Sequence, residues 1–309
     1  MPELPEVETI RRQLSNVLVG QTIQDIVVRR EKSFPHFAEA TRGRQGIIGK
    51  EIVGVGRKAK VLIIDLEDDL HLLVHLKMTG QLIYQELGIR NQELGNIQFT
   101  DHKPHFKVGG RIVGGHPTDD WVKTLPTTHT RVIITLDRGI LYFNDMRVFG
   151  WIKLVDSDQW LVVSEKLPPD VIDSEFTSEY FIKQLKGVRR SIKIVLMDQA
   201  KIGGVGNIYA NEALWMAGID PRRAANSLTD QEVKRLYRAV KEVIAEGIRW
   251  GGASESTYKH INGLGGKYQE HFLVYKMQRK RCQRRGCKGV IKKITLGGRG
   301  TYFCASCQQ

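Results

Sequence analysis

The sequence predicts an α+β protein whose N-terminal part is a two-sheet β-sandwich with one helix, and whose C-terminal part is helical and ends in a cysteine-rich hairpin. Three observations predict this class. Alternating and apolar runs typical of strands extend to Phe143, helical spacing dominates after Leu167-Pro-Pro-Asp170, and all four cysteines fall in the last 28 residues. A chain of 309 residues is long enough for two domains.

The first predicted element is a helix that begins at Pro5. Proline suits the first helical position, and Glu6 and Glu8 suit the positive end of the helix dipole. Apolar residues then recur at helical spacing, namely Val7, Ile10, Leu14, Val17 and Leu18. Gly20 follows as a stop signal. We expect this helix to dock on a core and to hold the start of the chain still.

Strand-like segments follow the helix. They are Thr22–Arg29, Glu51–Gly56, Lys60–Leu66, Leu70–Leu76, Gln81–Tyr84, Arg131–Leu136 and Ile140–Phe143. Asp137-Arg138-Gly139 joins the last two segments as a short hairpin connection. Together these segments predict a two-sheet sandwich that carries the first helix.

A stretch rich in Gly, His and Asp, at about residues 85–128, fits no regular element. Loops of this length are uncommon inside compact domains, so we interpret it as a surface insertion in an N-terminal domain of residues 1–163. His102, His105 and His116 are candidate metal ligands within it. A solvated loop is the simpler interpretation of the same residues.

Helical patterns dominate after a predicted linker at residues 164–176. We expect helices at Thr177–Leu185 and Ile192–Gln199, and a further helix that opens with a capping box of Thr229 and Glu232. These elements belong to a predicted domain of residues 177–274. A small cysteine domain, residues 275–309, completes the chain.

The formal net charge of +13 favours a polyanionic partner, although a basic protein can also be simply a soluble one. No apolar run is long enough to span a bilayer, and the charged amino terminus lacks the apolar stretch of a signal peptide. We therefore expect an intracellular protein that has no membrane partner.

Cys282, Cys287, Cys304 and Cys307 form two pairs separated by sixteen residues. In a reducing compartment this arrangement favours a metal over disulfides, and four thiolates suit one closed structural zinc site. Nine basic residues surround the cysteines: Arg279, Lys280, Arg281, Arg284, Arg285, Lys288, Lys292, Lys293 and Arg299. Such density suits the phosphate backbone of a duplex, and the alternative is a solvated charged face.

The start of the chain has the features of a catalytic amine. The residue after Met1 is small, so we expect Met1 to be removed and Pro2 to present a secondary amine. An α-amino group has a pKa of about 7.7–8, which leaves a useful fraction unprotonated at neutral pH. Glu3 and Glu6 lie beside it in the sequence. The alternative is an ordinary helix start whose glutamates serve only the dipole.

Three motifs together resemble the formamidopyrimidine-DNA glycosylase family (Fpg, MutM), bacterial enzymes that excise oxidised purines and then cut the strand. They are Pro2-Glu-Leu-Pro-Glu6, Gly203-Gly-Val-Gly206-Asn207 and Gly298-Arg299-Gly300 before the last cysteine pair. The resemblance spans the chain apart from the insertion. The first cysteine pair encloses four residues, where the family generally has two. The resemblance implies a helix-two-turn-helix domain and a zinc-finger hairpin behind the sandwich.

The resemblance also implies a monomeric, bifunctional DNA glycosylase and AP lyase, cytoplasmic and associated with the bacterial nucleoid. Its substrates would be 8-oxoguanine and formamidopyrimidines in duplex DNA. Pro2 would form the Schiff base, Glu3 would act as acid and Glu6 would order the site. Lys60, a surface lysine by pattern alone, and Arg299 would assist β- and δ-elimination.

Met78, Arg147 and Phe149 match the residues that fill the duplex after the damaged nucleotide has rotated out. Apolar wedges of this kind offset the cost of lost stacking. By pattern alone, Met78 is core filler and His75 a core histidine. The resemblance implies further DNA contacts at His75, His129, Arg189, Arg190, Asn207, Thr257 and Tyr258. The turn before Asn207 would place backbone N–H groups near a phosphate.

Two other functions fit parts of the sequence. One is an oxidised-pyrimidine glycosylase of the endonuclease VIII branch, whose members usually begin Pro-Glu-Gly-Pro-Glu. The other is a zinc-dependent DNA-binding protein without catalysis, for which the basic hairpin would suffice.

Overall fold

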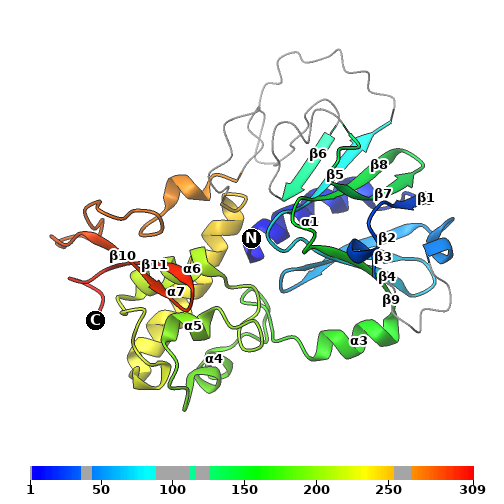
Figure 1. Cartoon of the computed structure of the whole chain (residues 1–309). Helices are drawn as coiled ribbons and strands as arrows, with labels where there is room; N and C mark the ends of the chain where they lie inside the picture. Colours follow the sequence, from blue (N-terminus) through cyan, green and yellow to red (C-terminus); the bar gives the residue numbers. More distant parts are fainter. Residues whose placement is uncertain (1, 36–43, 88–110, 116–124, 254–265) are drawn as a thin grey trace. The chain divides into compact units, whose positions relative to one another are not determined.

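The computed structural model describes residues 2–35, 44–87, 111–115, 125–253 and 266–309. It divides into two compact units (Figure 1). The N-terminal unit contains Pro2, Glu6–Glu165, Ala253 and Gly266, and the C-terminal unit contains Glu3–Pro5, Lys166–Gly252 and Lys267–Gln309. No helix in the described part of the chain is long and apolar enough to cross a membrane.

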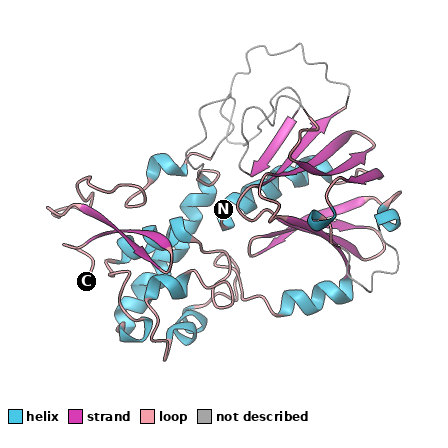
Figure 2. Ribbon diagram, viewed as in Figure 1, coloured by secondary structure: helices cyan, strands magenta, loops and turns pink. Residues whose placement is uncertain are grey.

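The N-terminal unit is built on two antiparallel sheets (Figure 2). The five-stranded sheet has the order β1 (Ile23–Val28), β7 (Thr130–Leu136), β8 (Gly139–Asp145), β5 (Gly80–Glu86) and β6 (Arg111–Gly115). The four-stranded sheet has the order β2 (Ile52–Lys58), β3 (Val61–Leu66), β4 (Leu70–His75) and β9 (Trp151–Asp156). Short 3-10 turns lie at Glu31–Ser33 and Arg44–Ile47. The predicted two-sheet architecture is confirmed.

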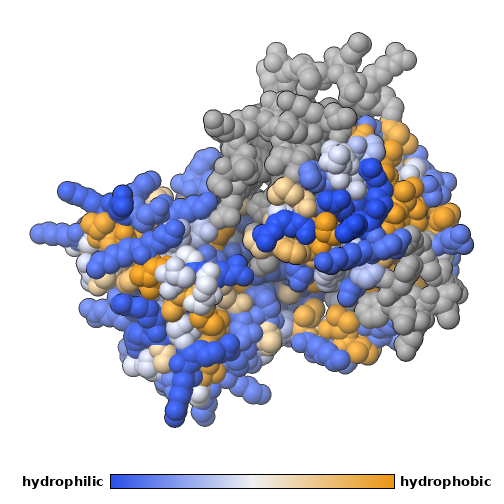
Figure 3. All heavy atoms as spheres, viewed as in Figure 1, coloured by the Kyte–Doolittle hydropathy of each residue, from blue (hydrophilic) through white to orange (hydrophobic). Residues whose placement is uncertain are grey.

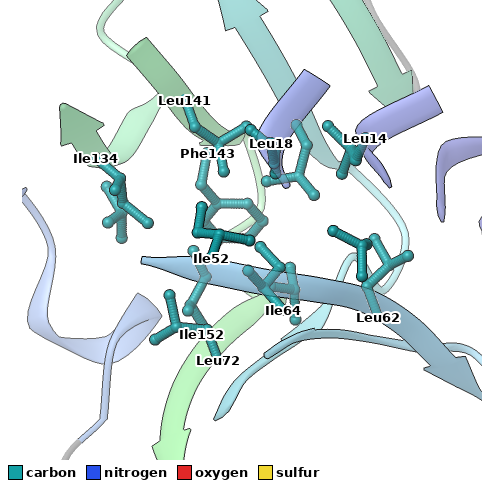
Figure 4. Packing of buried hydrophobic residues seen from close by; sticks show 14 of the residues in the cluster. Leu14, Leu18, Ile52, Leu62, Ile64, Leu72, Ile134, Leu141, Phe143 and Ile152 are labelled. Carbon is teal, nitrogen blue, oxygen red and sulfur yellow. The ribbon is translucent and has the colours of Figure 1, made fainter. Parts of the chain in front are cut away.

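Helix α1 (Leu4–Leu18) packs on the core of this unit, as its apolar spacing predicts. Its buried side chains share one cluster with residues of both sheets, so the helix face and the two inner sheet faces exclude water together. Figure 4 shows Leu14 and Leu18 of α1 beside Phe143 of β8, with Ile64 of β3 below them. Gly20, at φ +77, ends the helical segment in a left-handed turn.

Three parts of this unit differ from the prediction. Strand β9 (Trp151–Asp156) was not expected, because the predicted strands ended at Phe143. The stretch 85–128 was expected to lack regular structure, but Arg111–Gly115 forms β6, which pairs antiparallel with β5. β6 is an edge strand and pairs with one neighbour only. Such a strand does not require alternating polar and apolar residues, so its sequence gave only a weak strand signal. Helix α3 (Ser157–Glu165) was also missed, and it has no buried residue. The sequence signal for this helix was the capping box of Asp156 and Gln159. The side chain of each residue accepts a hydrogen bond from the backbone N–H of the other.

The C-terminal unit contains α4 (Ser178–Leu185), α5 (Ile192–Leu196), α6 (Asn207–Ala217), α7 (Asp230–Arg249) and a hairpin of β10 (Ile291–Leu296) and β11 (Arg299–Cys304). It also has 3-10 turns at Ala225–Ser227 and Tyr268–His271. Thr177 caps α4, and the predicted capping box of Thr229 and Glu232 is present at α7. Gly247 lets α7 approach α6, because a Cβ there would lie 2.5 Å from the Tyr209 ring.

Candidate functional site

Glu3 is fixed at the N-terminus of α6 within the C-terminal unit. Its side chain is buried, its Oε1 accepts the Ile208 N–H at 2.9 Å, and its Oε2 lies 3.4 Å from the Tyr209 nitrogen. The positive end of the helix dipole stabilises the carboxylate charge. The residue next to Pro2 is thereby anchored. These two N–H groups lie in the first turn of α6, after Asn207, and the phosphate contact of the preceding glycine turn stays a prediction.

The glycine-rich turn before α6 exists because the start of the chain passes against it. Gly204 has φ +88, and a Cβ there would lie 2.4 Å from Cδ1 of Leu4. A Cβ on Gly206 would lie 2.2 Å from Cδ of Glu3. The Leu4 N–H also donates to the Gly204 carbonyl at 3.1 Å. Glycines at these positions make room for Glu3 and Leu4. This packing explains why the turn is rich in glycine although it lacks the spacing of a nucleotide-binding loop.

The turn of the terminal hairpin carries Arg299, whose side chain is exposed. The amide of Asn207 donates to the Gly300 carbonyl at 3.2 Å. Lys193 Nζ donates to the same carbonyl at 3.0 Å and to the Thr301 hydroxyl at 2.7 Å. The structure therefore brings together the predicted site residues Asn207 and Arg299 in the C-terminal unit.

Lys193 was missed by sequence reasoning. Its side chain is fully buried, and this burial lowers its pKa to about 7, with the Glu3 charge raising it and the Arg299 charge lowering it. Lys193 therefore lies in the electrostatic field of two predicted site residues, Glu3 and Arg299. Its sequence signal was a lysine inside the otherwise apolar run Ile192–Leu196.

In the N-terminal unit, Pro2 is buried and Glu6 is half-buried. Glu6 Oε1 accepts the Ala253 N–H at 2.6 Å, which ties α1 to the residue just before the segment 254–265. The predicted contacts Thr257 and Tyr258 lie outside the described residues, as do His102, His105 and His116.

Lys60 occupies the tight turn between β2 and β3, and its side chain is buried. Ala59 before it has φ +51, and its carbonyl accepts a hydrogen bond from Arg57 Nη1 at 2.8 Å. Arg57 Nε also donates to Glu8 of α1 at 3.1 Å. Burial opposes the Glu8 charge, but hydrogen bonds from Arg11, Arg12 and Arg57 outweigh it and lower the pKa of Glu8 to about 2. An ion-pair network thus holds the Lys60 turn against α1.

His75 lies at the end of β4 in the electrostatic field of Lys60. Burial, together with the charges of Lys77 and Lys60, lowers the pKa of His75 to about 3, so the ring is neutral near pH 7. Its Nδ1 accepts the Lys77 N–H at 3.0 Å, which places the ring proton on Nε2. His75 is therefore a neutral hydrogen-bond donor.

Met78, Arg147 and Phe149 form one exposed cluster, which we call the wedge. Arg147 Nη1 lies 3.4 Å from the Met78 sulfur, and the Arg147 guanidinium lies 4.7 Å from the centre of the Phe149 ring. Met78 is 40% and Phe149 47% exposed, although both are large apolar side chains. Exposed apolar groups held together in this way indicate a contact surface.

Three further predicted DNA contacts, His129, Arg189 and Arg190, lie outside the clusters described above. The His129 carbonyl accepts the Asp145 N–H at 2.9 Å, next to the turn that carries the wedge residues Arg147 and Phe149. Arg189 is exposed, whereas Arg190 forms an ion pair with Asp198 at 2.6 Å.

The four cysteines converge on one point. Their sulfur atoms lie within 4.8 Å of one another, with 3.7 Å between Cys282 and Cys307 and 3.6 Å between Cys287 and Cys304. Thiolates bound tetrahedrally to zinc at ~2.3 Å lie ~3.8 Å apart, so this geometry fits a metal site. The Trp215 indole N–H and the Gly289 N–H donate to Cys282 and Cys287, each at 3.3 Å. The four-residue spacing of the first pair is compatible with closure of the site.

The basic residues around the cysteines, apart from Arg284, are exposed. Figure 3 shows hydrophilic side chains that project from this part of the molecule, with hydrophobic patches between them. Arg284 has a structural position instead, because it donates to the carbonyls of Trp215 and Met216 at the end of α6 and lies over the Trp215 ring.

A β-sandwich that carries the amino-terminal helix, a helical unit that anchors Glu3, and a basic four-cysteine hairpin define a DNA repair glycosylase with a zinc-finger element. Three family models match the chain: the formamidopyrimidine-DNA glycosylase N-terminal domain at residues 1–152, its H2TH domain at 167–259, and the zinc finger found in FPG and IleRS at 279–309. The chain belongs to the formamidopyrimidine-DNA glycosylase (Fpg, MutM) family.

Relatives and solved structures agree. The chain is 38% identical to a formamidopyrimidine-DNA glycosylase of Pelotomaculum thermopropionicum, over 100% of this chain and 99% of the relative. It is 30% identical, with a TM-score of 0.81 and full coverage of both chains, to a Lactococcus lactis FPG mutant in complex with a Fapy-dG-containing DNA. Wild-type Lactococcus lactis FPG in complex with an oxidized-pyrimidine-containing DNA matches with a TM-score of 0.80, 30% identity and full coverage.

Proposed function

We propose that this protein is a bifunctional glycosylase and AP lyase that removes oxidised purines, 8-oxoguanine and formamidopyrimidines, from duplex DNA. It would act as a monomer on DNA in the bacterial cytoplasm. The observation that carries the proposal is the anchoring of the chain start, in which Glu3 is held by the backbone of α6 and Glu6 binds the Ala253 N–H. Because Glu3 and Glu6 are held, the movement of the neighbouring Pro2 amine is restricted, which favours attack on one atom of a bound nucleotide.

The reaction begins when the Pro2 nitrogen, freed by removal of Met1, attacks C1′ of the rotated nucleotide. The Glu3 carboxylate takes up the proton that the Pro2 nitrogen releases on attack. The glycosidic bond breaks as Glu3 delivers this proton to the sugar oxygen or to the departing base. The product is an iminium, which has no nitrogen proton to lose and remains an electron sink. Loss of a C2′ proton expels the 3′ phosphate, and a second elimination expels the 5′ phosphate, which leaves a one-nucleotide gap.

Cationic and neutral donors hold the phosphates during these steps. We assign Lys60 to proton transfer and phosphate binding in the first elimination and Arg299 to the second. Asn207 grips the phosphate beside the lesion, and the Nε2 proton of His75 donates to a phosphate oxygen. The joint contact of Asn207 and Lys193 with Gly300 supports a rigid Arg299 turn.

The wedge takes the place of the rotated nucleotide in the duplex. We propose that His129 and Arg189 contact the backbone nearby, and that Thr257 and Tyr258 contact the lesion. One zinc ion, held by the four cysteines, organises the terminal hairpin and takes no part in the chemistry.

Borohydride trapping followed by peptide mapping tests the proposal. Wild-type protein incubated with an 8-oxoguanine duplex should yield a covalent adduct at Pro2, and a variant with a non-removable amino-terminal extension should yield none. Zinc content and circular dichroism of the extended variant serve as the folding control. An undiminished adduct in the extended variant would reject Pro2 as the nucleophile.

Oxidised pyrimidines are a second candidate substrate class, because a similar solved structure is a complex with DNA that contains one. Single-turnover excision from 8-oxoguanine paired with cytosine and from thymine glycol separates the two classes. Faster excision of thymine glycol would favour the pyrimidine activity.

A further inference from the structure

Asp145 is a buried carboxylate at the end of β8, and both of its oxygens accept hydrogen bonds. Oδ2 accepts the N–H groups of Phe149 at 2.8 Å and Gly150 at 2.7 Å. Oδ1 accepts the Thr79 hydroxyl and the Arg147 N–H, the latter at 3.2 Å. The Asp145 side chain has no exposed surface, so water does not compete for these four donors.

The four donors belong to the two turns that carry the wedge. Thr79 follows Met78 in the turn between β4 and β5, and Arg147 and Phe149 donate through their own backbones. Both turns contain a non-glycine residue in the left-handed region, Lys77 at φ +49 and Val148 at φ +54. Such conformations persist only where neighbouring groups hold them, and the Asp145 carboxylate does so on both sides.

We propose that Asp145 is a positioning residue for base extrusion, whose carboxylate sets the two turns so that Met78, Arg147 and Phe149 enter the duplex as one body. The inference rests on the proposed function, in which the wedge fills the space left by the rotated nucleotide. A carboxylate suits this position because it is acceptor-only and has room for four donors. An amide of the same shape has one acceptor oxygen and would turn an NH₂ group towards two of the donors.

If Asp145 positions the wedge, its substitution should lower two activities, base excision and abasic-site cleavage, by unequal amounts. A base lesion must be unstacked before attack, whereas an abasic site has no base to unstack. Loss of wedge geometry should therefore slow excision of 8-oxoguanine much more than strand cleavage at a preformed abasic site. A purely structural role for Asp145 would lower both activities together.

The test compares Asp145→Asn with Asp158→Asn, which removes the same charge from an exposed position on α3. Duplexes carry 2-aminopurine opposite the lesion, so that its fluorescence reports wedge insertion. We expect Asp145→Asn to slow both the fluorescence phase and 8-oxoguanine excision by about tenfold or more, with abasic-site cleavage within about threefold, because unstacking is the step affected. Asp158→Asn should match wild type. Equal losses of excision and abasic-site cleavage in Asp145→Asn would overturn the proposal.

Two further sets of variants keep the test decisive. If Asp145→Asn fails to fold, Thr79→Val removes one of the four donors and Thr79→Ser restores it, so only the valine variant should show the unequal loss. Identical behaviour of these two variants would also overturn the proposal. Met78→Ala and Phe149→Ala test the wedge itself. If both leave the fluorescence phase unchanged, the wedge assignment under the proposed function fails, whatever Asp145 does.

Discussion

Substitution of Gly206 by alanine should displace Glu3 from the N-terminus of α6. The new Cβ would lie 2.2 Å from Cδ and 2.4 Å from Oε1 of Glu3, far inside contact distance. Gly206 has extended backbone, φ −128 and ψ −158, which alanine adopts without strain. The three atoms nearest to the new Cβ all belong to the Glu3 side chain, and this flexible side chain moves because the helix backbone does not.

The cost follows from the hydrogen bonds that Glu3 loses. The 2.9 Å bond from Ile208 N–H to a carboxylate is worth about 1.5–3 kcal/mol, whereas the 3.4 Å approach of Tyr209 contributes little. Alanine at the N-cap in place of glycine adds about 0.5 kcal/mol. We expect a loss of about 2–3 kcal/mol in the stability of the C-terminal unit. Each 1.4 kcal/mol that reappears in the activation barrier slows excision about tenfold.

A double-mutant cycle measures whether the effect passes through Glu3. Single-turnover excision of 8-oxoguanine is measured for Gly206→Ala, Glu3→Ala and the double variant. In the Glu3→Ala background the added Cβ meets no carboxylate, so Gly206→Ala should have almost no further effect. Gly56→Ala is the matched control, because its Cβ would meet Ile63 at an ordinary 3.8 Å. Additive losses in the cycle, or full activity of Gly206→Ala, would refute the reasoning.

Three further predictions concern phosphate binding, the metal site and pH. Arg299→Ala should weaken binding to all duplexes and flatten the log–log salt dependence by about one unit, and an unchanged slope would remove Arg299 from the phosphate contacts. Cys282→Ser should release the metal and lower DNA affinity without changing the cooperative unfolding of the β-sandwich, as measured by metal analysis and by unfolding followed by circular dichroism. Between about pH 6.5 and pH 3 the unfolded chain protonates His75 but the folded chain does not, so stability falls as the pH falls. His75→Gln should make this fall shallower in denaturation midpoints measured against pH.

Much of the fold was predictable because its signals are local. The α1 face depends on spacing within fifteen residues, and the Thr229 capping box depends on two residues three apart. The metal site followed from cysteine spacing, although only the structure shows that four intervening residues still allow the sulfur atoms to converge. The proximity of Met78 to Arg147 was expected from the family resemblance, since the two residues are 69 positions apart.

The parts that escaped prediction depend on partners distant in sequence. Lys193 is buried because Gly300 and Thr301, more than a hundred residues later, accept its hydrogen bonds. Glu3 accepts the N–H of Ile208 at a separation of 205 residues, which no periodicity reveals. Asp145 had a partial signal, since an aspartate at the end of a strand often accepts nearby backbone N–H groups. Its bond to Thr79 required the fold.

Carboxylates that accept backbone N–H groups recur at the functional positions of this basic protein. Glu3 binds the start of α6, Glu6 binds Ala253, Asp145 binds the turn at Phe149, and Glu212 accepts three N–H groups of residues 273–275. An N–H donor carries no net charge, so these bonds position a loop without using an arginine or a lysine as partner. Where Glu3 and Asp145 are buried, their negative charge is also withdrawn from the surface that would face phosphates, and burial raises the pKa of Glu212 to about 7, which reduces its charge. The same residues therefore fix the geometry of the site and favour its cationic surface, so exchanging one for its amide should disturb local geometry more than long-range attraction to DNA.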